Sequence, residues 1–597
     1  MTIPRPEYPR PQFVREQWLC LNGEWQFEMD PGDSGLERGL LERELTQCII
    51  VPFCPESSLS GIGYTDFMNV VWYRREVPIP GAWSGPRVLL HFQAVDYDAT
   101  VWVNGVEVGR HRGGFTPFTC DLAGVVEPGA PATIVVRARD YTRNLQPVGK
   151  QSQRYANHGC VYTRTTGIWQ TVWMEPVPDT ALLRPRITPD VTNGCFHVEQ
   201  GLTNPTSGLR LRIRLRDDTG EVVCEERPAN HDFSTRITLP IPETRRRLWC
   251  PSDPFLYDLE IELLDANGAV VDAASSYAGL RSVAIDGKAI RLNGEVVFQR
   301  LVLDQGYYPD GIMTAPTDEA LRRDIELSIE AGFNGARLHQ KVFEERFLYH
   351  ADRLGYLVWG EFGDWGCRDP ERHEGIQRVT ATYITQWLEA LERDYAHPCI
   401  VGWCPLNETA QPITDHVTAL DDVTRGMFLA AKAIDGSRPV LDTSGYSHRV
   451  PESDVYDCHD YEQDPRKFAE NHAGLADGIP FLNGPPERPI SIPYRGQPFF
   501  VSEFGGIWWN PDAKAGEDSW GYGQRPKNLD EFYDRFEKLC AVLLDNPDMF
   551  GYCYTQLTDV YQEQNGVVTF DRKKKFDMAR LRAAQQRPAA IEREEKE

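Results

Sequence analysis

Residues 399–408 read Cys-Ile-Val-Gly-Trp-Cys-Pro-Leu-Asn-Glu, an apolar run of strand length that ends on the carboxyl group of Glu408. Residues 497–503, Gln-Pro-Phe-Phe-Val-Ser-Glu, repeat this pattern and end on Glu503. Continuous apolar runs of this kind are typical of parallel strands, which are covered on both faces. Because burial of a carboxylate costs free energy unless the group is paired or used, the two runs predict buried strands that end at a functional site.

The residues around the two acids narrow the chemistry. A single glutamate at the end of a strand more often leads the chain back to solvent. Here Asn407 places an amide donor directly before Glu408, and Trp508 follows Glu503 with a second tryptophan next to it. Flat aromatic faces are suited to stacking against sugar rings. Two acids, an amide and aromatic rings together indicate a glycosidase.

From residue 283 onward, strand-like runs alternate with amphipathic helical segments. Residues 318–331 place Leu321, Ile325 and Ile329 on one face of a helix. Eight alternating strands favour a (β/α)8 TIM barrel over an open doubly wound sheet, and in a barrel the chemistry lies at the C-terminal strand ends. Glu408 and Glu503 would then follow strands four and seven. Strands are expected at residues 296–303, 335–338, 357–359, 400–405, 440–442, 455–459, 499–502 and 551–556.

The sequence before residue 283 predicts only β structure. Residues 1–177 contain short aromatic-rich strands, and the Asn104-Gly105 step is a hairpin signal because both residues tolerate positive φ. This pattern indicates a jelly-roll β-sandwich. Residues 178–282 contain several short strands over about a hundred residues, which fits an immunoglobulin-like β-sandwich. With the barrel at 283–597, the chain is expected to form three domains, as its length also suggests.

Composition argues against several classes of partner. With 88 acidic and 63 basic residues, the formal net charge is −25, which disfavours nucleic acid and anionic membrane surfaces. The N-terminus lacks the apolar core of a secretory signal, and no stretch approaches the roughly 18 apolar residues of a membrane span. The 14 cysteines are scattered without zinc-ligand spacing. We therefore expect free thiols and a cytoplasmic protein.

Motifs in all three predicted regions resemble those of glycoside hydrolase family 2. Residues 21–25, 71–75 and 166–173 look like the sugar-binding jelly roll of that family, and residues 248–257 look like its immunoglobulin-like domain. His397-Pro398 leading to Asn407-Glu408 is similar to the family's acid/base motif. Residues 501–505, Val-Ser-Glu-Phe-Gly, are similar to its nucleophile motif. The order and spacing of these motifs extend the resemblance over nearly the whole chain.

The resemblance implies an exo-acting, retaining mechanism in which Glu503 is the nucleophile and Glu408 is the acid/base. In such enzymes the two carboxyl groups lie ~5 Å apart. Hydrogen bonds from groups such as Tyr461 are expected to support Glu503, and Asn407 is expected to bind the sugar 2-hydroxyl. Arg337 resembles the arginine that family members place beneath the nucleophile. The alternative is an ion pair with an acid in the barrel floor, and the two roles do not exclude each other. The other expected substrate-binding residues are His339, Glu361, His459 and Trp508, with Asp304, Trp365, Tyr554 and Asn565 as weaker candidates for the pocket wall.

The sequence leaves the sugar open. The leading expectation is a β-galactosidase-like activity, although the magnesium pattern of long β-galactosidases is missing, so no metal or other cofactor is expected. The alternative is a β-glucuronidase or related uronidase. The Asn-x-Lys element with which those enzymes bind the uronate carboxylate has no match here, so another basic residue such as Lys341 or Lys514 would have to bind it. A non-catalytic carbohydrate-binding protein is the alternative from another class. The family resemblance also allows a homo-oligomer, and residues 146–154 form either a solvated connection or a loop over the barrel mouth.

Overall fold

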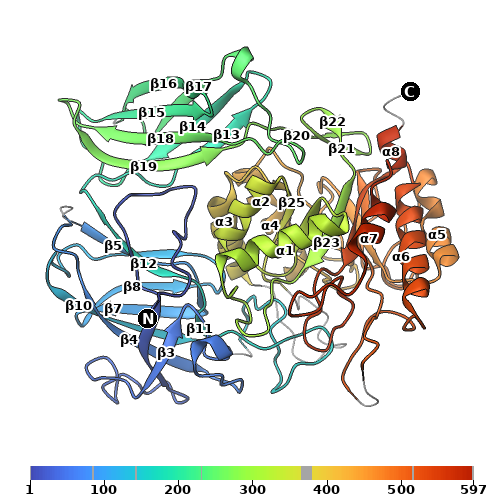
Figure 1. The fold of residues 1–597 in the computed structure, drawn as a ribbon, viewed down its shortest axis with the longest axis horizontal. Coiled ribbons are helices and arrows are strands. Elements are labelled where there is room, and N and C mark those ends of the chain that lie inside the picture. Colours follow the sequence, from blue (N-terminus) through green and yellow to red (C-terminus); the bar gives the residue numbers. More distant parts are fainter. Residues whose placement is uncertain are drawn as a thin grey trace.

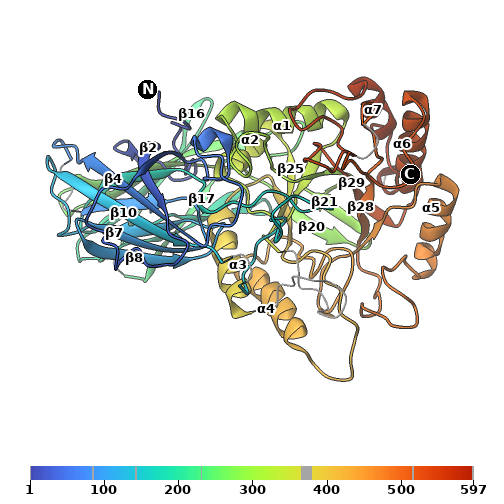
Figure 2. The same cartoon turned by 90° about the horizontal axis from the view of Figure 1, so that it is seen from below.

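The computed structural model describes residues 2–83, 87–141, 144–229, 231–364, 380–513 and 517–593. Figure 1 shows two all-β regions, coloured blue and teal to green, beside a larger region of helices and strands coloured yellow to red. In the view turned by 90°, the first β region and helices α5 to α7 lie at opposite ends of the molecule (Figure 2).

Two antiparallel sheets form most of the first β region. Their strand orders are β3-β2-β4-β10-β7-β8 and β1-β12-β5-β9. The buried faces enclose a core that includes Trp25, Tyr73 and Phe92. Asn104 and Gly105 both have positive φ and join β7 to β8, which confirms the predicted hairpin. The strands are β1 (Leu19–Cys20), β2 (Gly23–Met29), β3 (Gln47–Val51), β4 (Val70–Pro78), β5 (Arg87–Phe92), β6 (Val95–Asp96), β7 (Asp98–Val103), β8 (Val106–Arg112), β9 (Phe118–Asp121), β10 (Pro131–Arg139), β11 (Gly167–Ile168) and β12 (Val172–Val177).

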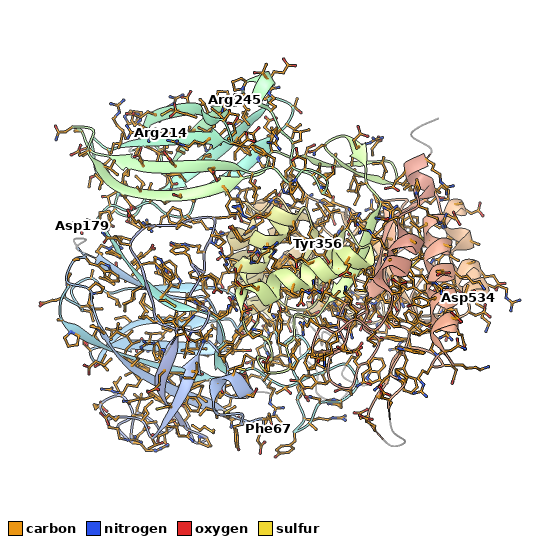
Figure 3. The ribbon with its side chains drawn as sticks, viewed as in Figure 1. Phe67, Asp179, Arg214, Arg245, Tyr356 and Asp534 are labelled. Carbon is orange, nitrogen blue, oxygen red and sulfur yellow. The ribbon has the colours of Figure 1, made fainter. Side chains whose placement is uncertain are left out.

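The second β region contains a three-stranded sheet, β13-β14-β17, and a four-stranded sheet, β16-β15-β18-β19. Buried and exposed residues alternate along β17, as expected when one face meets a core and the other meets solvent. Arg214 Nη1 lies 2.6 Å from Glu262 Oε2 on the neighbouring strand β18. Figure 3 places Arg214 and Arg245 on this region, away from Tyr356 in the third. The strands are β13 (Arg186–Asp190), β14 (Cys195–Gly201), β15 (Arg210–Asp217), β16 (Gly220–Pro228), β17 (Ser234–Pro240), β18 (Tyr257–Leu264) and β19 (Val270–Ala278).

The third region begins with a small sheet, β20-β21-β22, and continues into seven parallel strands in the order β26-β25-β24-β23-β29-β28-β27. Its strands are β20 (Val283–Asp286), β21 (Ala289–Leu292), β22 (Glu295–Val296), β23 (Gln299–Asp304), β24 (Gly335–Leu338), β25 (Leu357–Glu361), β26 (Ile400–Cys404), β27 (Tyr456–Asp460), β28 (Phe499–Gly505) and β29 (Met549–Thr555). Its helices are α1 (Asp318–Ala331), α2 (Glu345–Leu354), α3 (Ala381–Asp394), α4 (Ala419–Ile434), α5 (Pro465–His472), α6 (Leu529–Leu544), α7 (Met578–Gln585) and α8 (Ala590–Arg593).

Helix α1 shows how local sequence sets an element of this region. The hydroxyl of Thr317 accepts a hydrogen bond from Ala320 N and so caps the first turn. Leu321 and Ile325 are buried on one face, as the periodicity predicts. Gly332 ends the helix with φ of +103°, a conformation that favours glycine. The helix spans residues 318–331 as predicted.

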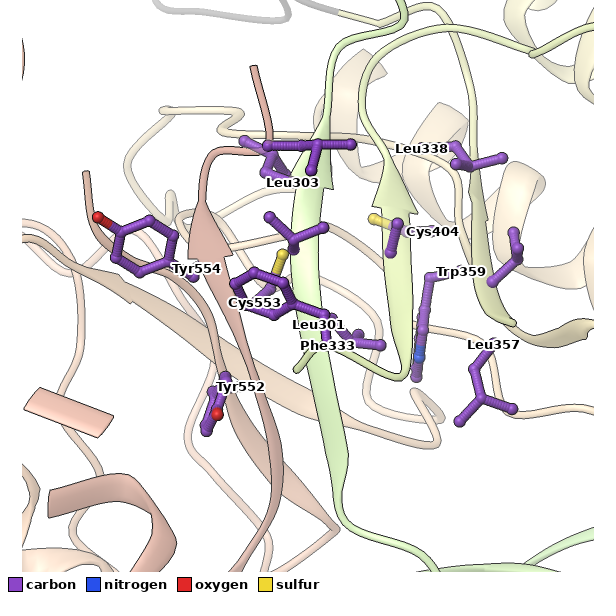
Figure 4. Close-up of a cluster of buried hydrophobic side chains, with 14 of the residues drawn as sticks. Leu301, Leu303, Phe333, Leu338, Leu357, Trp359, Cys404, Tyr552, Cys553 and Tyr554 are labelled. Atoms are coloured by element: carbon purple, nitrogen blue, oxygen red, sulfur yellow. The ribbon is translucent and has the colours of Figure 1, made fainter. Parts of the chain in front are cut away.

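The parallel sheet encloses the largest core of the molecule. Figure 4 shows Leu301, Trp359, Cys404, Tyr552 and Cys553 gathered between its strands, and all five are buried. Because apolar side chains fill both sides of the strands, the carboxyl ends are left as the place where polar groups meet. Seven of the eight predicted strands are present as named strands of this curved parallel sheet.

The fifth predicted strand, residues 440–442, is the one that is absent as a named strand, and isolated parallel bridges form there instead. Val440 bridges to Trp403, and Ser444 bridges to Asn407. The side chain of Asp442 accepts hydrogen bonds from the backbone N–H groups of residues 449 and 450, at 2.6 and 2.9 Å. Within the segment, Val440 N donates to Asp454 Oδ2 at 2.9 Å, so a side chain satisfies a backbone group that a regular strand pair would satisfy. Segment 440–444 still lies beside β26.

All cysteines in the described ranges are free thiols, in agreement with the sequence. In the same ranges, no helix has both the length and the apolar character needed to cross a membrane. The cytoplasmic location stays a prediction.

Candidate active site

The predicted site residues meet at the C-terminal edge of the parallel sheet. Arg337 lies in β24, Glu361 ends β25, His459 lies in β27 and Glu503 lies in β28. These four side chains are buried, whereas Glu408, which follows β26, is partly exposed. Since the strands run in parallel, their carboxyl ends share one edge, and residues distant in sequence become neighbours.

The two glutamates face each other across a histidine. One oxygen of each carboxylate and one nitrogen of His459 all lie within 4.8 Å of one another. His459 Nδ1 is 2.9 Å from Glu408 Oε1 and 3.3 Å from Glu503 Oε2. Its Nε2 is 3.0 Å from Ser444 Oγ. Burial acts to lower the pKa of His459, but Glu503 and Glu408 outweigh it, so the pKa is raised. The imidazole therefore links both acids.

Glu503 is held by two further donors. The hydroxyl of Tyr461 donates to Glu503 Oε2 at 2.5 Å, as the sequence predicts. Arg337 Nη1 lies 3.4 Å from Glu503 Oε1 and also donates to the carbonyl oxygen of Ser502 at 2.6 Å. Hydrogen bonds from a cation to a carboxylate are stronger than those between neutral groups. These contacts fix the orientation of the Glu503 carboxylate.

Arg337 also takes part in an ion pair beneath the site, in addition to its contact with Glu503. Its Nη2 pairs with Glu361 Oε1, and His339 Nδ1 lies 3.2 Å from Glu361 Oε2. Gln340 N donates to the same Oε2 at 3.0 Å. Burial acts to raise the pKa of Glu361, but Arg337 and His339 outweigh it and lower the pKa to about 2. Glu361 and His339 thus form the floor beneath Glu503.

Asn407 has an amide donor that is not used within the described residues. Its Oδ1 accepts from Arg337 Nη2 at 3.1 Å, and its backbone N–H donates to Asp364 Oδ2 at 3.1 Å. Its Nδ2 is buried and has no hydrogen-bond partner in the described parts of the chain. Leaving such a donor unsatisfied costs roughly 1–3 kcal/mol. A ligand hydroxyl next to Glu408 would remove that cost.

The backbone of Glu408 adopts an uncommon conformation. Its φ is +49°, a region that non-glycine residues rarely adopt and that clusters at functional sites. The N–H of Glu408 donates to Ser444 O at 2.9 Å. Segment 440–444, which stands at the position of the fifth predicted strand, therefore holds the backbone that carries this acid.

The described contacts of the remaining candidates lie away from the two acids. Trp508 Nε1 donates to Ser519 Oγ at 3.1 Å, and Arg525 lies over the Trp508 ring. Its role as a sugar platform stays a prediction. Lys341 donates to two backbone carbonyls, at 2.6 and 2.7 Å, which leaves it poorly placed to bind a uronate. Trp365 and Lys514 lie outside the described residues.

The structure also adds residues that the sequence analysis missed. The ring of Tyr522 stacks on Tyr461, with centroids 3.4 Å apart, and so lies on the Glu503 side of the site. Ser444 contacts His459 from segment 440–444. Both residues lie in irregular segments without strand or helix periodicity, so no local pattern pointed to them.

Residues 146–152 come from the first β region and are buried against the third. Gly149 N donates to Gly363 O at 2.8 Å. A Cβ atom on Gly149, whose φ is +59°, would lie 2.3 Å from Gln340 O, so the backbones approach as closely as glycine allows. Of the two alternatives for this segment, the structure favours a loop over the barrel region.

Three sets of side chains in the described residues could each offer three ligands to a metal ion. One is Glu408, His459 and Glu503, and the other two are Asp190, Cys195, His197 and Asp352, His397, Cys399. In the last set, His397 Nδ1 and Cys399 N both contact the Asp352 carboxylate, at 2.6 and 2.9 Å, so protein groups already use those oxygens. The prediction of a metal-free site stays a prediction.

Comparison with known proteins points to one family. Residues 64–157 match the glycosyl hydrolases family 2 sugar binding domain, and residues 182–281 match a second domain described as glycosyl hydrolases family 2. Both matches agree with the resemblance of the sequence motifs to glycoside hydrolase family 2. The matched ranges lie in the two β regions, and the carboxylates described above lie beyond them in the third.

Individual relatives carry two different names. A β-glucuronidase of Paenibacillus borealis is 27% identical over 72% of this chain and 74% of its own length. A β-galactosidase of Thermoanaerobacter pseudethanolicus is 26% identical over 63% of this chain and 48% of its own length. The crystal structure of Ruminococcus gnavus β-glucuronidase superposes with a TM-score of 0.78 over 98% of this chain and 99% of that chain, at 19% identity. The structural likeness concerns the fold.

Proposed function

We propose that the protein is an exo-acting, retaining β-glycosidase that removes terminal sugars by double displacement. The observation that carries this proposal is the separation of at most 4.8 Å between an oxygen of Glu408 and an oxygen of Glu503. Inverting enzymes keep their carboxyl groups roughly 6.5–9.5 Å apart to admit a water, whereas retaining enzymes keep them at ~5–5.5 Å. The short separation supports a covalent glycosyl-enzyme.

Glu503 acts as the nucleophile and Glu408 as the acid/base. In the first step the Glu503 carboxylate bonds to the anomeric carbon, the bond to the aglycone oxygen breaks, and that oxygen takes the proton of Glu408. In the second step Glu408 takes a proton from water, the water oxygen bonds to the anomeric carbon, and Glu503 leaves. Two displacements restore the β configuration.

The surroundings of the two acids support these roles. The side chain of Glu503 is 5% exposed and is fixed by Tyr461 and Arg337, as a nucleophile at the base of a pocket requires. The side chain of Glu408 is 15% exposed, so it lies nearer the solvent that supplies water and receives the aglycone. Asn407 Nδ2 is free to bind the sugar 2-hydroxyl, and this hydrogen bond strengthens in the transition state.

The finer fold assignment is part of the same proposal. The two β regions are interpreted as a jelly roll at residues 1–177 and an immunoglobulin-like sandwich at residues 178–282. The third region, 283–597, is interpreted as a (β/α)8 barrel in which segment 440–444 takes the place of strand five. Its position beside β26 supports this interpretation.

The glycone has two candidates. The sequence favours a β-galactosidase-like activity, and the β-galactosidase of Thermoanaerobacter pseudethanolicus is a relative that bears this name. The β-glucuronidase names of other relatives favour a uronidase. A non-catalytic carbohydrate-binding protein is disfavoured, because binding alone requires neither a close acid pair nor the strained backbone at Glu408.

The proposed function is tested with a panel of 4-nitrophenyl β-glycosides: galactoside, glucoside, mannoside, glucuronide and galacturonide. We expect one or more to release nitrophenol, and Glu503→Gln to lower kcat by at least about 10⁴-fold because it removes the nucleophile. Glu408→Ala with azide should give a β-configured glycosyl azide. An α-configured azide product would reverse the two roles, and hydrolysis that survives Glu503→Gln would refute the site.

A further inference from the structure

A lysine, a tyrosine and a glutamate meet between the first β region and the parallel-sheet region. Lys150 and Tyr162 come from the first region, and Glu563 comes from the segment after β29. The hydroxyl of Tyr162 donates to Glu563 Oε2 at 2.5 Å, and Asn565 Nδ2 donates to Glu563 Oε1 at 3.3 Å. Lys150 is 7% exposed, Glu563 2% and Tyr162 0%. The group of Lys150, Tyr162 and Glu563 is called the interdomain cluster below.

Backbone contacts hold the interdomain cluster in place. Tyr162 N donates to Lys150 O at 2.7 Å, and Ser152 N donates to Tyr162 O at 2.8 Å. Gln562 Nε2 donates to Gly159 O at 2.7 Å. The first contacts tie the two sides of the loop together, and the last ties the loop to the residue before Glu563. Lys150 and Tyr162 therefore keep a fixed position relative to the barrel region.

The segment that carries Glu563 packs beside two segments close to the proposed nucleophile. Glu563 forms a parallel bridge with Trp520, two residues before the Tyr522 ring that stacks on Tyr461. Tyr461 in turn donates to Glu503. A Cβ atom on Gly506 would lie 3.4 Å from Asn565 Nδ2, so the segment that carries Glu563 and Asn565 runs beside the chain just after the nucleophile.

The charges of Lys150 and Glu563 act on each other. Burial acts to lower the pKa of Lys150, but Cys160, Glu563, Glu408 and Glu503 outweigh it and raise the pKa. Burial raises the pKa of Glu563, and Lys150 is the strongest of the groups that oppose the rise. The positive charge of Lys150 is thus balanced by Glu563, and the carboxylates of Glu408 and Glu503 also act on it.

We propose that the interdomain cluster makes this enzyme selective for neutral glycones and against uronic acids. The inference rests on the proposed glycosidase function and names the class of sugar. A hydroxymethyl group on the sugar ring can donate to Glu563 and accept from Lys150. A uronate carboxylate would instead add a negative charge, in a buried site, beside Glu563 and Glu503. Like charges in a site of low dielectric repel strongly. This selectivity differs from that named for the β-glucuronidase relatives.

Matched substrate pairs test the proposal. The pairs are 4-nitrophenyl β-galactoside with β-galacturonide, and β-glucoside with β-glucuronide, and the readout is the ratio of kcat/KM within a pair. We expect the wild-type enzyme to favour the neutral member of its active pair by at least about 100-fold. Glu563→Gln keeps the shape and removes the charge, so it should lower this ratio by at least about 10-fold.

Further variants separate the cluster from general damage. Lys150→Met leaves Glu563 uncompensated and should raise the neutral-to-uronide ratio. Adding Lys150→Met to Glu563→Gln should abolish the gain in uronide hydrolysis that Glu563→Gln alone produces. In the single variant, Lys150 no longer balances Glu563, so its charge can attract the uronate carboxylate. Glu487→Gln, at an exposed acid, serves as the matched control and should leave the ratio unchanged.

Two results would overturn the proposal. One is a wild-type enzyme that prefers the uronide, which would make Lys150 a carboxylate-binding residue. The other is a folded Glu563→Gln enzyme with an unchanged neutral-to-uronide ratio of kcat/KM. If that variant fails to fold, an unchanged ratio in Lys150→Met would overturn the proposal instead. Failure of the underlying function is distinguishable, since it would appear as no hydrolysis of any panel member or as activity that survives Glu503→Gln.

Discussion

At the scale of single residues, Glu361 does the most to keep Arg337 in a buried site. Arg337 has no solvent exposure, and its guanidinium contacts Glu361, Glu503 and Asn407. Without Glu361, the described contacts of this buried cation would be Glu503, the amide of Asn407 and the carbonyl oxygen of Ser502. The ion pair between Arg337 and Glu361 therefore fixes Arg337 under Glu503. Its contribution to the free energy of unfolding can be measured.

Glu361→Gln is expected to lower the free energy of unfolding at pH 7 by about 3 kcal/mol, because it removes the closer of the two carboxylates that compensate a buried cation. The folded-state pKa of Glu361 is about 2, below its ordinary value of 4.5, so its stabilising effect is present above pH 4.5 and is lost as the pH falls toward 2. The difference between wild type and variant should shrink between pH 5 and 3.5 in urea denaturation. Glu127→Gln, at an exposed acid, is the control. A difference independent of pH would contradict the prediction.

At the scale of elements, periodicity and apolar runs were sufficient for most of the parallel region. Helix α1 has the predicted bounds, and β24 spans the predicted residues 335–338. The sequence predicted a regular strand at residues 440–442, but the backbone N–H of Val440 donates to the carboxylate of Asp454, a side-chain contact that no strand pattern reveals. Ser444 and Tyr522 were missed because they lie in irregular segments without strand or helix periodicity. Acids at strand ends were found because the parallel topology alone brings them together.

His448 holds segment 440–444 against the neighbouring strand. Its Nδ1 lies 2.9 Å from Asp442 Oδ1, and its Nε2 lies 3.2 Å from Asp457 Oδ1 in β27. Burial acts to lower the pKa of His448, but Asp442 and Asp457 outweigh it and raise the pKa to about 10. The charged imidazole therefore joins segment 440–444, at the position of the fifth predicted strand, to β27.

His448→Gln is expected to destabilise the protein most below pH 6.5. Because the folded-state pKa is raised from 6.5 to about 10, the stabilising effect of His448 is fully present below pH 6.5 and is lost as the pH rises through 10. Urea denaturation at pH 6, 8 and 9.5 should show the difference from wild type shrinking at each step. His416→Gln, at an exposed histidine, should show no such trend. A difference that grows with pH would be evidence against the bridge.

At the scale of the whole molecule, buried contacts join the second β region to the parallel-sheet region. Trp249 Nε1 donates to Asp352 O at 2.7 Å, and Arg281 donates to Pro398 O and Ile400 O at 3.0 and 2.9 Å. Arg281 thereby ties the second β region to the start of β26, the strand that precedes Glu408. Contacts between distant segments leave no local signal, so the sequence offered two readings of loop 146–154 and could not choose between them.

Gly149→Ala is expected to lower kcat/KM by about 10–100-fold, the loss typical of a displaced positioning group, with a small change in Tm. A Cβ at this position would lie 2.3 Å from Gln340 O, so the loop must move away and take Lys150 with it. Gly159→Ala is a matched control in the same loop: its φ is +50°, close to the +59° of Gly149, but its Cβ would meet nothing within 4 Å. Backbone strain alone would affect both variants equally, whereas the close approach affects only Gly149. Equal losses of activity in the two variants would mean that the first β region does not complete the site.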